Sequence, residues 1–352
     1  MWAQERHSFV EKIAVIGAGA WGTALAIALG RHPSYRVMLW AFEKEVVESV
    51  RSAHVNEPFL AGCPMSENIE ATQSLAEAIG GAEVVLSVMP SHHARRVWSQ
   101  MKPLLDPQTL LVSATKGIEN ETLLRMSQVI DDVLTHGDGS FSPRLCCISG
   151  PTFAREVAKG FPTAMSVASA NPELSAQVQE IFSDATFRLY RCDDVIGLEL
   201  GGALKNVIAI AAGVVDGLGY GHNTIAGLIT RGLSEMTRLS VACGGRAETM
   251  SGLSGLGDLV LTCTGGLSRN RSLGMELGRG RKLEEIVADM RGMVAEGVMT
   301  TSAAVGLARS VHLEMPILEQ MHAVLEHDKD PREAIHELMH RPLTQESALF
   351  RV

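Results

Sequence analysis

Short runs of β-branched and other apolar residues alternate with amphipathic stretches through the first half of the chain. This alternation is typical of a parallel sheet covered by helices. The segment 12–17 (KIAVIG) predicts a first strand, and 21–30 (WGTALAIALG) predicts the helix that follows it. Further strands are predicted by their apolar runs at 35–40, 82–89, 109–117, 144–150, 163–169 and 186–191.

The strand pattern stops near residue 193. The segment 193–218 is helical in period and begins with an aspartate that can cap a helix. Helical patterns continue to 331–340, and Pro342 ends the last of them. A chain of 352 residues is too long for one small core. We therefore expect an α/β domain over residues 1–192, followed by an all-α domain over residues 193–352.

Composition narrows the classes of partner. The formal net charge of −9 argues against a surface for nucleic acid or an anionic membrane, so an anionic substrate would need a local basic cluster. The six cysteines include no CxxC pair, which favours reduced thiols. The charged N-terminus does not resemble a signal peptide, and the longest purely apolar run, 207–215, is too short to span a membrane. We expect a cytoplasmic protein.

Three glycines, Gly17, Gly19 and Gly22, stand in G-x-G-x-x-G spacing between the first strand and its helix. They permit a tight turn and a close approach of a pyrophosphate to the helix N-terminus, so we predict a Rossmann-type domain that binds a dinucleotide. The alternative is a glycine-rich turn that only packs the helix on the strand. After the second strand, Glu43 favours the ribose 2′-hydroxyl of NAD, whereas Lys44 could meet the 2′-phosphate of NADP, so both cofactors stay open.

Lys205 is the only ionisable residue between Glu199 and Asp216. A buried ammonium is costly unless it is paired or used in chemistry. Asp258 and Thr262 are four residues apart and would share one face of a helix. The segment 265–271 (GGLSRNR) could form a phosphate-binding loop in an otherwise acidic protein, or it could be a polar surface loop with two arginines.

Two other stretches invite interpretation. Lys116 ends a predicted strand, where it is either a solvated loop lysine or a contact to an anion and a hydroxyl. The segment 336–340 (HELMH) matches the zinc-peptidase pattern, but only twelve residues follow it to supply a third ligand, and Pro342 ends the helix. Two surface histidines on a terminal helix explain this match more simply, and we expect no metal.

Six motifs follow one another along the chain. They are GAGAWGTALA (17–26), SATKGIE (113–119), GPTFAREVAKGFPTA (150–164), LKNVIAIAAGVVDGLG (204–219), GLGDLVLTCTGGLSRNR (255–271) and VAEGVMTT (294–301). In this order they resemble the motifs of the bacterial NAD(P)-dependent glycerol-3-phosphate dehydrogenases. The resemblance runs from about residue 12 to the end of the chain and is far more specific than the glycine fingerprint alone.

The resemblance implies reversible hydride transfer between NAD or NADP and glycerol 3-phosphate or dihydroxyacetone phosphate, in a homodimer that supplies glycerol 3-phosphate for phospholipid synthesis. It implies that Lys205 is the general acid/base, working with Lys116, Asp258 and Thr262. The substrate contacts it implies are Lys116, Gly150, Thr152, Lys205, Asp258, Ser268, Arg269 and Asn270. The cofactor contacts it implies are Gly17, Gly19, Ala20, Trp21, Gly22, Phe42, Lys116, Ala154, Arg269 and Glu296.

Phe42 departs from relatives that often carry His or Arg at this position, which leaves the choice between NAD and NADP open. Two rival interpretations remain. One is a dehydrogenase with the same order of domains that acts on a different hydroxy acid. The other is a non-enzymatic dinucleotide sensor, in which Lys205 and Asp258 form only a structural ion pair.

Overall fold

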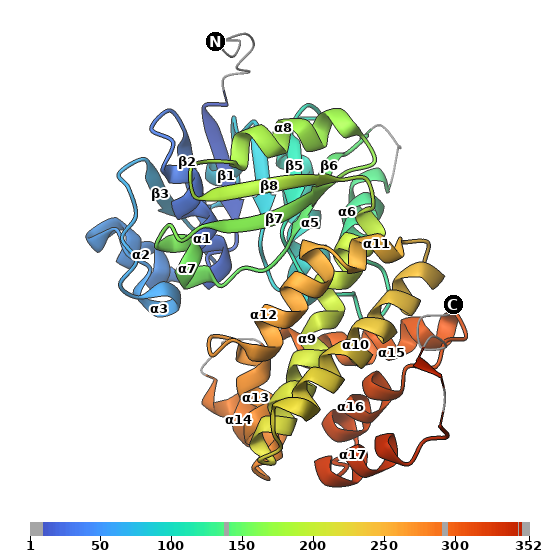
Figure 1. Cartoon of the computed structure of the whole chain (residues 1–352). Helices are drawn as coiled ribbons and strands as arrows, with labels where there is room; N and C mark the ends of the chain where they lie inside the picture. Colours follow the sequence, from blue (N-terminus) through green and yellow to red (C-terminus); the bar gives the residue numbers. More distant parts are fainter. Residues whose placement is uncertain (1–9, 137–140, 291–294, 344, 347–352) are drawn as a thin grey trace.

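The computed structural model describes residues 10–136, 141–290, 295–343 and 345–346. Within these ranges eight strands form one sheet in the order β3-β2-β1-β4-β5-β6-β7-β8 (Figure 1). All the strands predicted from the apolar runs are present, and β3 is an additional strand. The strands are β1 Lys12–Ile16, β2 Arg36–Trp40, β3 Ile69–Thr72, β4 Val84–Ser87, β5 Leu110–Ser113, β6 Arg144–Ser149, β7 Thr163–Ala168 and β8 Phe187–Cys192.

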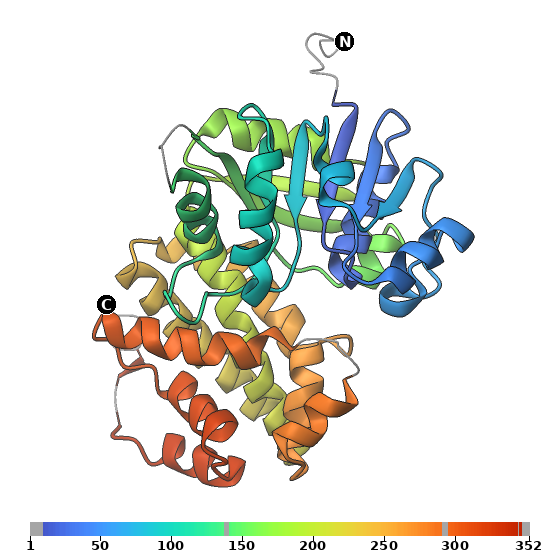
Figure 2. The same cartoon turned by 180° about the vertical axis from the view of Figure 1, so that it is seen from behind.

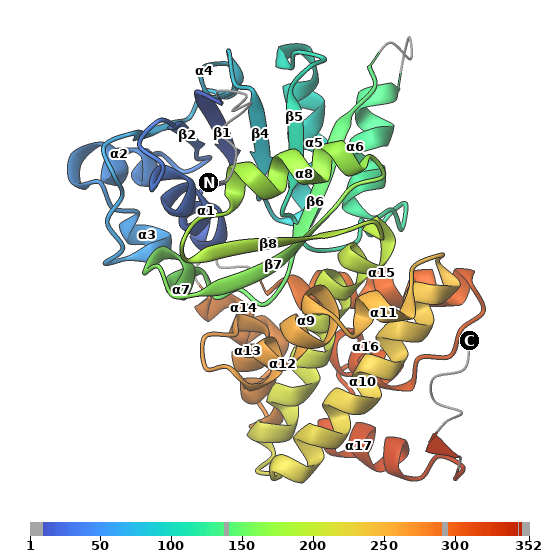
Figure 3. The ribbon, with the colours of Figure 1, turned by 45° about the horizontal axis from the view of Figure 1, so that its top comes forward.

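The expected parallel sheet is interrupted once, because β6 and β7 pair antiparallel, with Ser149 opposite Ser166. A parallel crossover needs a dozen or more residues and usually a helix that packs along the sheet. The connection from β6 to β7 holds only the short helix α7 (Ala154–Ala158), which packs on α1 (Ala20–Gly30) instead. Figure 3 shows β7 and β8 running across the direction of β1, β2, β4 and β5.

Helices cover both faces of the sheet, as the alternation of side chains along β1 requires. Ile13 and Val15 join a core with α1, α2 (Lys44–Ala53) and α8 (Pro172–Phe182). Ala14 and Ile16 join the opposite core with α4 (Leu75–Ile79), α5 (Ser91–Met101) and α6 (Met126–Thr135). Figure 2 turns this side of the sheet toward the viewer. The order of the first six strands is that of doubly wound nucleotide-binding sheets, in which ligands bind where the winding reverses, here between β1 and β4.

Beyond Cys192, where β8 ends, the described residues contain helices and no strand. Helix α9 (Val195–Gly217) begins after Asp194, whose Oδ1 accepts a hydrogen bond from Gly197 N at 2.8 Å. This change at β8 supports the proposed domain boundary near residue 192. The other helices of this part are α10 His222–Ala242, α11 Ala247–Met250, the π-helical turn η2 Leu253–Gly257, α12 Asp258–Thr264, α13 Arg269–Gly278, α14 Leu283–Asp289, α15 Glu296–Ser310, α16 Pro316–Glu326 and α17 Pro331–Met339.

Helix α9 forms the centre of the helical part, where α10, α12, α13, α15 and α16 pack around it. By length and composition alone it could cross a membrane, but 89% of its most apolar window is buried inside the protein. Its packing on α13 is backbone to backbone. A Cβ on Gly213 would lie 2.0 Å from Arg271 O, and a Cβ on Gly274 would lie 2.0 Å from Ile210 O.

The sheet half contains two further short helices, α3 (Glu57–Leu60) and the 3₁₀ turn η1 (Lys102–Leu104). All six cysteines are free. The neighbours Cys146 and Cys147 belong to two different apolar cores, on opposite faces of β6.

Candidate active site

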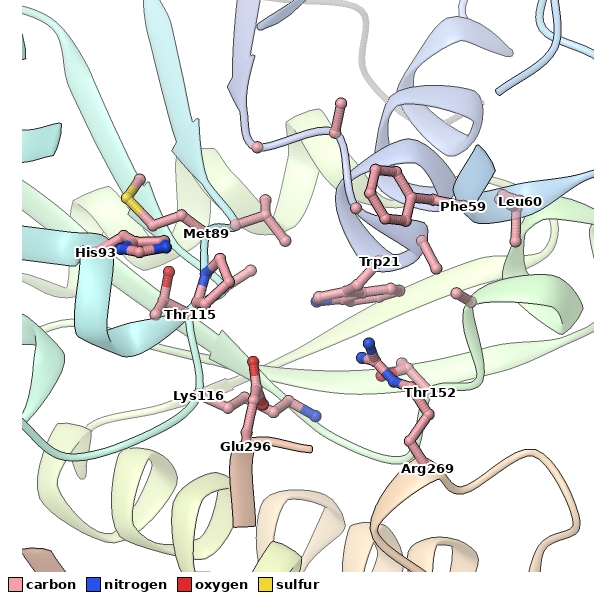
Figure 4. A pocket seen from close by; sticks show the side chains of 18 of the residues that line it. Trp21, Phe59, Leu60, Met89, His93, Thr115, Lys116, Thr152, Arg269 and Glu296 are labelled. Carbon is pink, nitrogen blue, oxygen red and sulfur yellow. The ribbon is translucent and has the colours of Figure 1, made fainter. Parts of the chain in front are cut away.

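A cleft of about 460 Å³ separates the carboxyl ends of the strands from the helical half (Figure 4). The turn after β1 and the segments that follow β2, β4, β5 and β6 form its sheet side. Residues of α9, α12, α13 and the start of α15 form the opposite side. The cleft therefore lies at the place where doubly wound sheets bind their ligands.

The glycine turn after β1 shapes one end of this cleft. Gly17 has a φ of +117°, and a Cβ there would lie 2.8 Å from Val88 O. A Cβ on Gly22 would lie 1.8 Å from Gly17 O, so this glycine lets α1 pack directly on the turn. Beside Gly19, by contrast, there is open space to 4 Å.

Two observations indicate that a ligand belongs in this space. Gly19 precedes α1 and provides no side-chain cap, so the first N–H groups of the helix remain available to an anion. Trp21, which projects into the cleft, has a buried Nε1 with no hydrogen-bond partner among the residues that the structure describes. Together these features fit the pyrophosphate and the adjoining groups of a dinucleotide.

Two lysines share one carboxylate on the other side of the cleft. Lys205 Nζ donates to Asp258 Oδ1 and, at 2.9 Å, to Thr262 Oγ1. Lys116 Nζ donates to Asp258 Oδ2 at 2.7 Å and to Gly150 O at 3.3 Å. Asp258 is fully buried and Lys205 is 6% exposed. Lys116, from the loop after β5, and Lys205, from α9, thus both bind the carboxylate of the first residue of α12.

Helix geometry explains why Asp258 and Thr262 act together. Asp258 begins α12 directly after the π-helical turn η2, and Thr262 follows one turn later on the same face. The Thr262 hydroxyl donates to Asp258 O at 2.6 Å and so presents its lone pairs to Lys205. The spacing of four residues predicted this shared face.

Burial lowers the pKa of Lys205 to about 8. Asp258 acts in the opposite direction by stabilising the ammonium, and the like charge of Lys116 lowers the pKa further. The pKa of Glu296, at the start of α15, is raised by burial, while Arg269, Lys116 and Lys205 partly oppose that rise. A lysine with a pKa near neutrality can both give and take a proton under ordinary conditions.

The start of α13 brings polar groups to the cleft. Ser268 caps this helix, because its Oγ accepts from Arg271 N at 3.2 Å, and Arg269 projects into the cleft near Thr152 (Figure 4). Arg271 does not line the cleft, since it forms an ion pair with Asp216 of α9. The basic loop predicted from 265–271 therefore offers one arginine to a ligand, not two.

Asn270 is held in a chain of hydrogen bonds. Its Oδ1 accepts from Gly297 N at 3.0 Å, and its Nδ2 donates to Asn206 Oδ1, also at 3.0 Å. Asn206 Nδ2 in turn donates to Glu296 Oε2 at 3.4 Å. These bonds fix the side chain of Asn270 and use one of the two hydrogens on its Nδ2.

Comparison with known proteins assigns the family. Two family models, NAD-dependent glycerol-3-phosphate dehydrogenase N-terminus and C-terminus, match residues 12–175 and 194–336. A relative from Koribacter versatilis named glycerol-3-phosphate dehydrogenase (NAD(P)+) is 60% identical over 337 residues, which cover 96% of this chain and 99% of that protein. The chain belongs to the NAD-dependent glycerol-3-phosphate dehydrogenase family.

Solved structures agree with this assignment. The crystal structure of glycerol-3-phosphate dehydrogenase from Coxiella burnetii is 41% identical, with a TM-score of 0.90 over 95% of this chain and 100% of that chain. A ketopantoate reductase from Ralstonia eutropha, 16% identical over 94% of this chain and 100% of that chain, has a TM-score of 0.59 and shares the fold alone. The predicted family and the predicted fold, a Rossmann-type domain followed by an all-helical one, are confirmed.

Most residues that the resemblance to glycerol-3-phosphate dehydrogenases implied line this cleft. Three lie just behind its surface: Gly22 packs α1 on the turn, Gly150 offers its carbonyl to Lys116, and Asp258 holds both lysines. The residues that line the cleft are Gly17, Gly19, Ala20, Trp21, Phe42, Lys116, Thr152, Ala154, Lys205, Thr262, Ser268, Arg269, Asn270 and Glu296.

Several lining residues were not predicted. Asn206 and Thr115 directly adjoin Lys205 and Lys116, and this adjacency was a signal that could have found them. Five more lie within the six motifs, close to residues that were predicted: Ala18, Ala114, Phe153, Arg155 and Leu267. The remaining residues come from segments that carry no motif of their own and reach the cleft only through the fold. They are Trp40, Phe59, Leu60, Val88, Met89, Pro90, His93, Arg96 and Val97. Glu43, which its position in the sequence made a candidate contact to the ribose, lines the cleft as well.

The HELMH segment of this dehydrogenase forms the end of α17 and its cap. The rings of His336 and His340 stack with their centroids 3.8 Å apart, and Glu337 Oε1 lies 2.6 Å from Lys329 Nζ. Over residues 10–136, 141–290, 295–343 and 345–346, no group of three or more His, Cys, Asp or Glu side chains is placed to hold a metal ion.

Proposed function

We propose that this protein catalyses the reversible reaction of sn-glycerol 3-phosphate with NAD(P)+ to give dihydroxyacetone phosphate, NAD(P)H and a proton, with Lys205 as the general acid/base. One observation carries the proposal. A buried lysine, held by Asp258 and Thr262, lines the same cleft as an uncapped helix N-terminus on one side and Arg269 on the other.

The proton is handled by Lys205. In the reducing direction its ammonium donates to the C2 carbonyl oxygen, and in the oxidising direction its free amine takes the proton from the C2 hydroxyl. When bound, NAD(P) supplies the chemistry of hydride transfer at C2. Asp258 and Thr262 orient Nζ, and Lys116 lies close enough to contact the substrate while it lowers the pKa of Lys205.

The substrate phosphate is anchored away from the reacting carbon. Arg269, Ser268 and the free amide hydrogen of Asn270 surround its proposed position at the start of α13, and Thr152 lies opposite. This anchoring uses binding energy to orient C2 on Lys205. The turn from Gly17 to Gly22 holds the pyrophosphate in this proposal, and Trp21, Phe42, Ala154 and Glu296 surround the rest of the cofactor.

The phosphate anchor is tested by measuring NADH and NADPH oxidation with dihydroxyacetone phosphate and with unphosphorylated dihydroxyacetone. Two lost hydrogen bonds between charged groups lower kcat/KM for the second substrate by roughly 10²- to 10⁴-fold. Equal rates with both substrates would favour the rival dehydrogenase for another hydroxy acid. Tight cofactor binding with no turnover of any phosphorylated ketone would favour the sensor.

The physiological setting is also part of the proposal. Six free cysteines support a location in the reducing cytoplasm, and family membership supports a homodimer that supplies glycerol 3-phosphate for phospholipid synthesis. Light scattering of the purified protein at several concentrations tests the dimer, for which a mass of one chain would be the contrary result.

A further inference from the structure

The rim of the cleft beyond β2 carries a carboxylate that the proposed reaction does not use. Glu43 follows β2 by three residues and lines the cleft next to Phe42. Gly17 N donates to Trp40 O at 3.1 Å, which ties the end of β2 to the glycine turn. The exposed side chain of Glu43 does not cap α2, so its oxygens remain free to accept hydrogen bonds from a ligand.

The next residue, Lys44, has a different environment. It lies outside the cleft lining, and its Nζ is 3.1 Å from Glu48 Oε1, one turn along α2. Both side chains of this pair are largely exposed. Of the two neighbouring charges that the sequence left as alternatives, the structure therefore presents the carboxylate to the cleft and the ammonium to solvent.

Two basic residues of α5 line the same rim, His93 and Arg96. The pKa of His93 is lowered, first by burial and then by the charge of Arg96, so its imidazole is neutral at pH 7. Glu43 acts on this ring in the opposite direction, which places the carboxylate within electrostatic reach of α5. Glu43 and Arg96 thus act in opposite directions on the same ring, so a ligand at this rim meets a carboxylate as well as the guanidinium.

We propose that Glu43 makes this site selective for NAD(H) over NADP(H). This inference rests on the proposed function and names its cofactor. In this fold an acidic residue about 20 residues beyond the glycine fingerprint accepts hydrogen bonds from the ribose hydroxyls, whereas NADP sites place an arginine nearby. A 2′-phosphate brings up to about two negative charges next to the carboxylate, and like charges this close repel each other.

Equilibrium binding tests this assignment without turnover. NADH and NADPH are titrated separately into the full-length protein, and the fluorescence of the reduced nicotinamide reports each Kd. We expect wild type to bind NADH at least roughly tenfold more tightly than NADPH, which corresponds to about 1.4 kcal/mol. Glu43→Gln narrows this ratio, and Glu43→Arg reverses it. Lys44→Gln is the matched control, because its ion pair lies outside the cleft, and it leaves the ratio unchanged.

Three results would overturn the assignment: equal or tighter binding of NADPH by wild type, equal weakening of both cofactors in Glu43→Gln, or a change of ratio in Lys44→Gln as large as that in Glu43→Gln. The proposed function fails separately. A protein that prefers NADH in the titration and does not reduce dihydroxyacetone phosphate would retain the cofactor assignment and lose the reaction.

Discussion

Burial of the Lys205 ammonium against Asp258 sets the pH range in which this residue can work. Its folded pKa of about 8 lies below the ordinary 10.5 of a lysine because desolvation disfavours the charge. In the proposed mechanism the protonated form reduces the ketone, so we expect kcat/KM for dihydroxyacetone phosphate to be level below pH 8 and to fall above it. Oxidation of glycerol 3-phosphate needs the free amine and rises with pH through the same value. Paired pH profiles in the two directions check this sign.

Substitution separates the role of Lys205 from that of its neighbours. Lys205→Met keeps most of the side-chain volume, and Lys116 still pairs with Asp258, so the variant leaves no unpaired buried carboxylate. We expect turnover to fall roughly 10²- to 10⁴-fold, the usual contribution of a general acid or base, with NADH affinity retained. Lys116→Met removes a like charge, which raises the pKa of Lys205 and moves the fall in kcat/KM for dihydroxyacetone phosphate to higher pH. If kcat/KM falls at the same pH as in wild type, the electrostatic effect of Lys116 on Lys205 is contradicted.

At the scale of elements, the contact between α9 and α13 depends on glycines. Gly274→Ala would place a Cβ 2.0 Å from Ile210 O. We expect a loss of roughly 1–3 kcal/mol in the free energy of unfolding, since overpacking in a core costs this much. The displaced α13 also carries Arg269 away from its place, which raises KM for dihydroxyacetone phosphate. Urea unfolding and steady-state kinetics measure the two effects.

Gly227→Ala is the matched control for this prediction. Gly227 lies inside α10, and a Cβ there would have no neighbour within 4 Å. Alanine is favoured over glycine in a helix by up to about 1 kcal/mol, so this variant is expected to be as stable as wild type or more so. A Gly274→Ala variant as stable as Gly227→Ala would contradict the packing explanation for the contact between α9 and α13.

Local patterns predicted the elements better than the contacts between them. The strand–glycine turn–helix at the N-terminus was predictable because its geometry is set within a few residues. The antiparallel β7 was not, because the direction of a strand depends on how the connection from β6 packs. Likewise Arg269 and Arg271 look equivalent in sequence, but their positions on α13 send one into the cleft and the other to Asp216. The pairing of Lys205 with Asp258, far along the chain, required the fold.

At the scale of the whole molecule, Glu199 of α9 ties the helical half to the sheet half. Its carboxylate accepts from Ser127 N at 2.7 Å, from Ser127 Oγ at 2.6 Å and from Arg125 Nη1 at 2.5 Å. Arg125 also closes the loop that carries Lys116, through an isolated bridge to Ile118. The hydrogen bonds of Glu199 therefore join the two halves close to the segment that carries Lys116.

Removing Glu199 leaves a largely buried guanidinium without its partner. We expect Glu199→Ala to lower the free energy of unfolding by about 3–5 kcal/mol, as when one member of a buried ion pair is deleted. Asp193→Ala breaks an exposed ion pair with Arg246 and is expected to cost about 0–1 kcal/mol. Denaturant unfolding measures the free energy of unfolding of both variants. Equally small losses in both would show that the buried ion pair between Glu199 and Arg125 adds no more stability than the exposed one.

In the proposed reaction, the close packing of the α9 and α13 backbones also limits the length of the substrate. Lys205 is carried by α9, and Arg269 begins α13, so the close packing of these two helices sets the backbone span between the proposed proton donor and the proposed phosphate anchor. Replacing one residue of the cleft wall leaves that span unchanged. A homologue that acts on a longer sugar phosphate would therefore need a larger distance between these two helices. A rigid inhibitor of matching length would bind a site that is already preorganised.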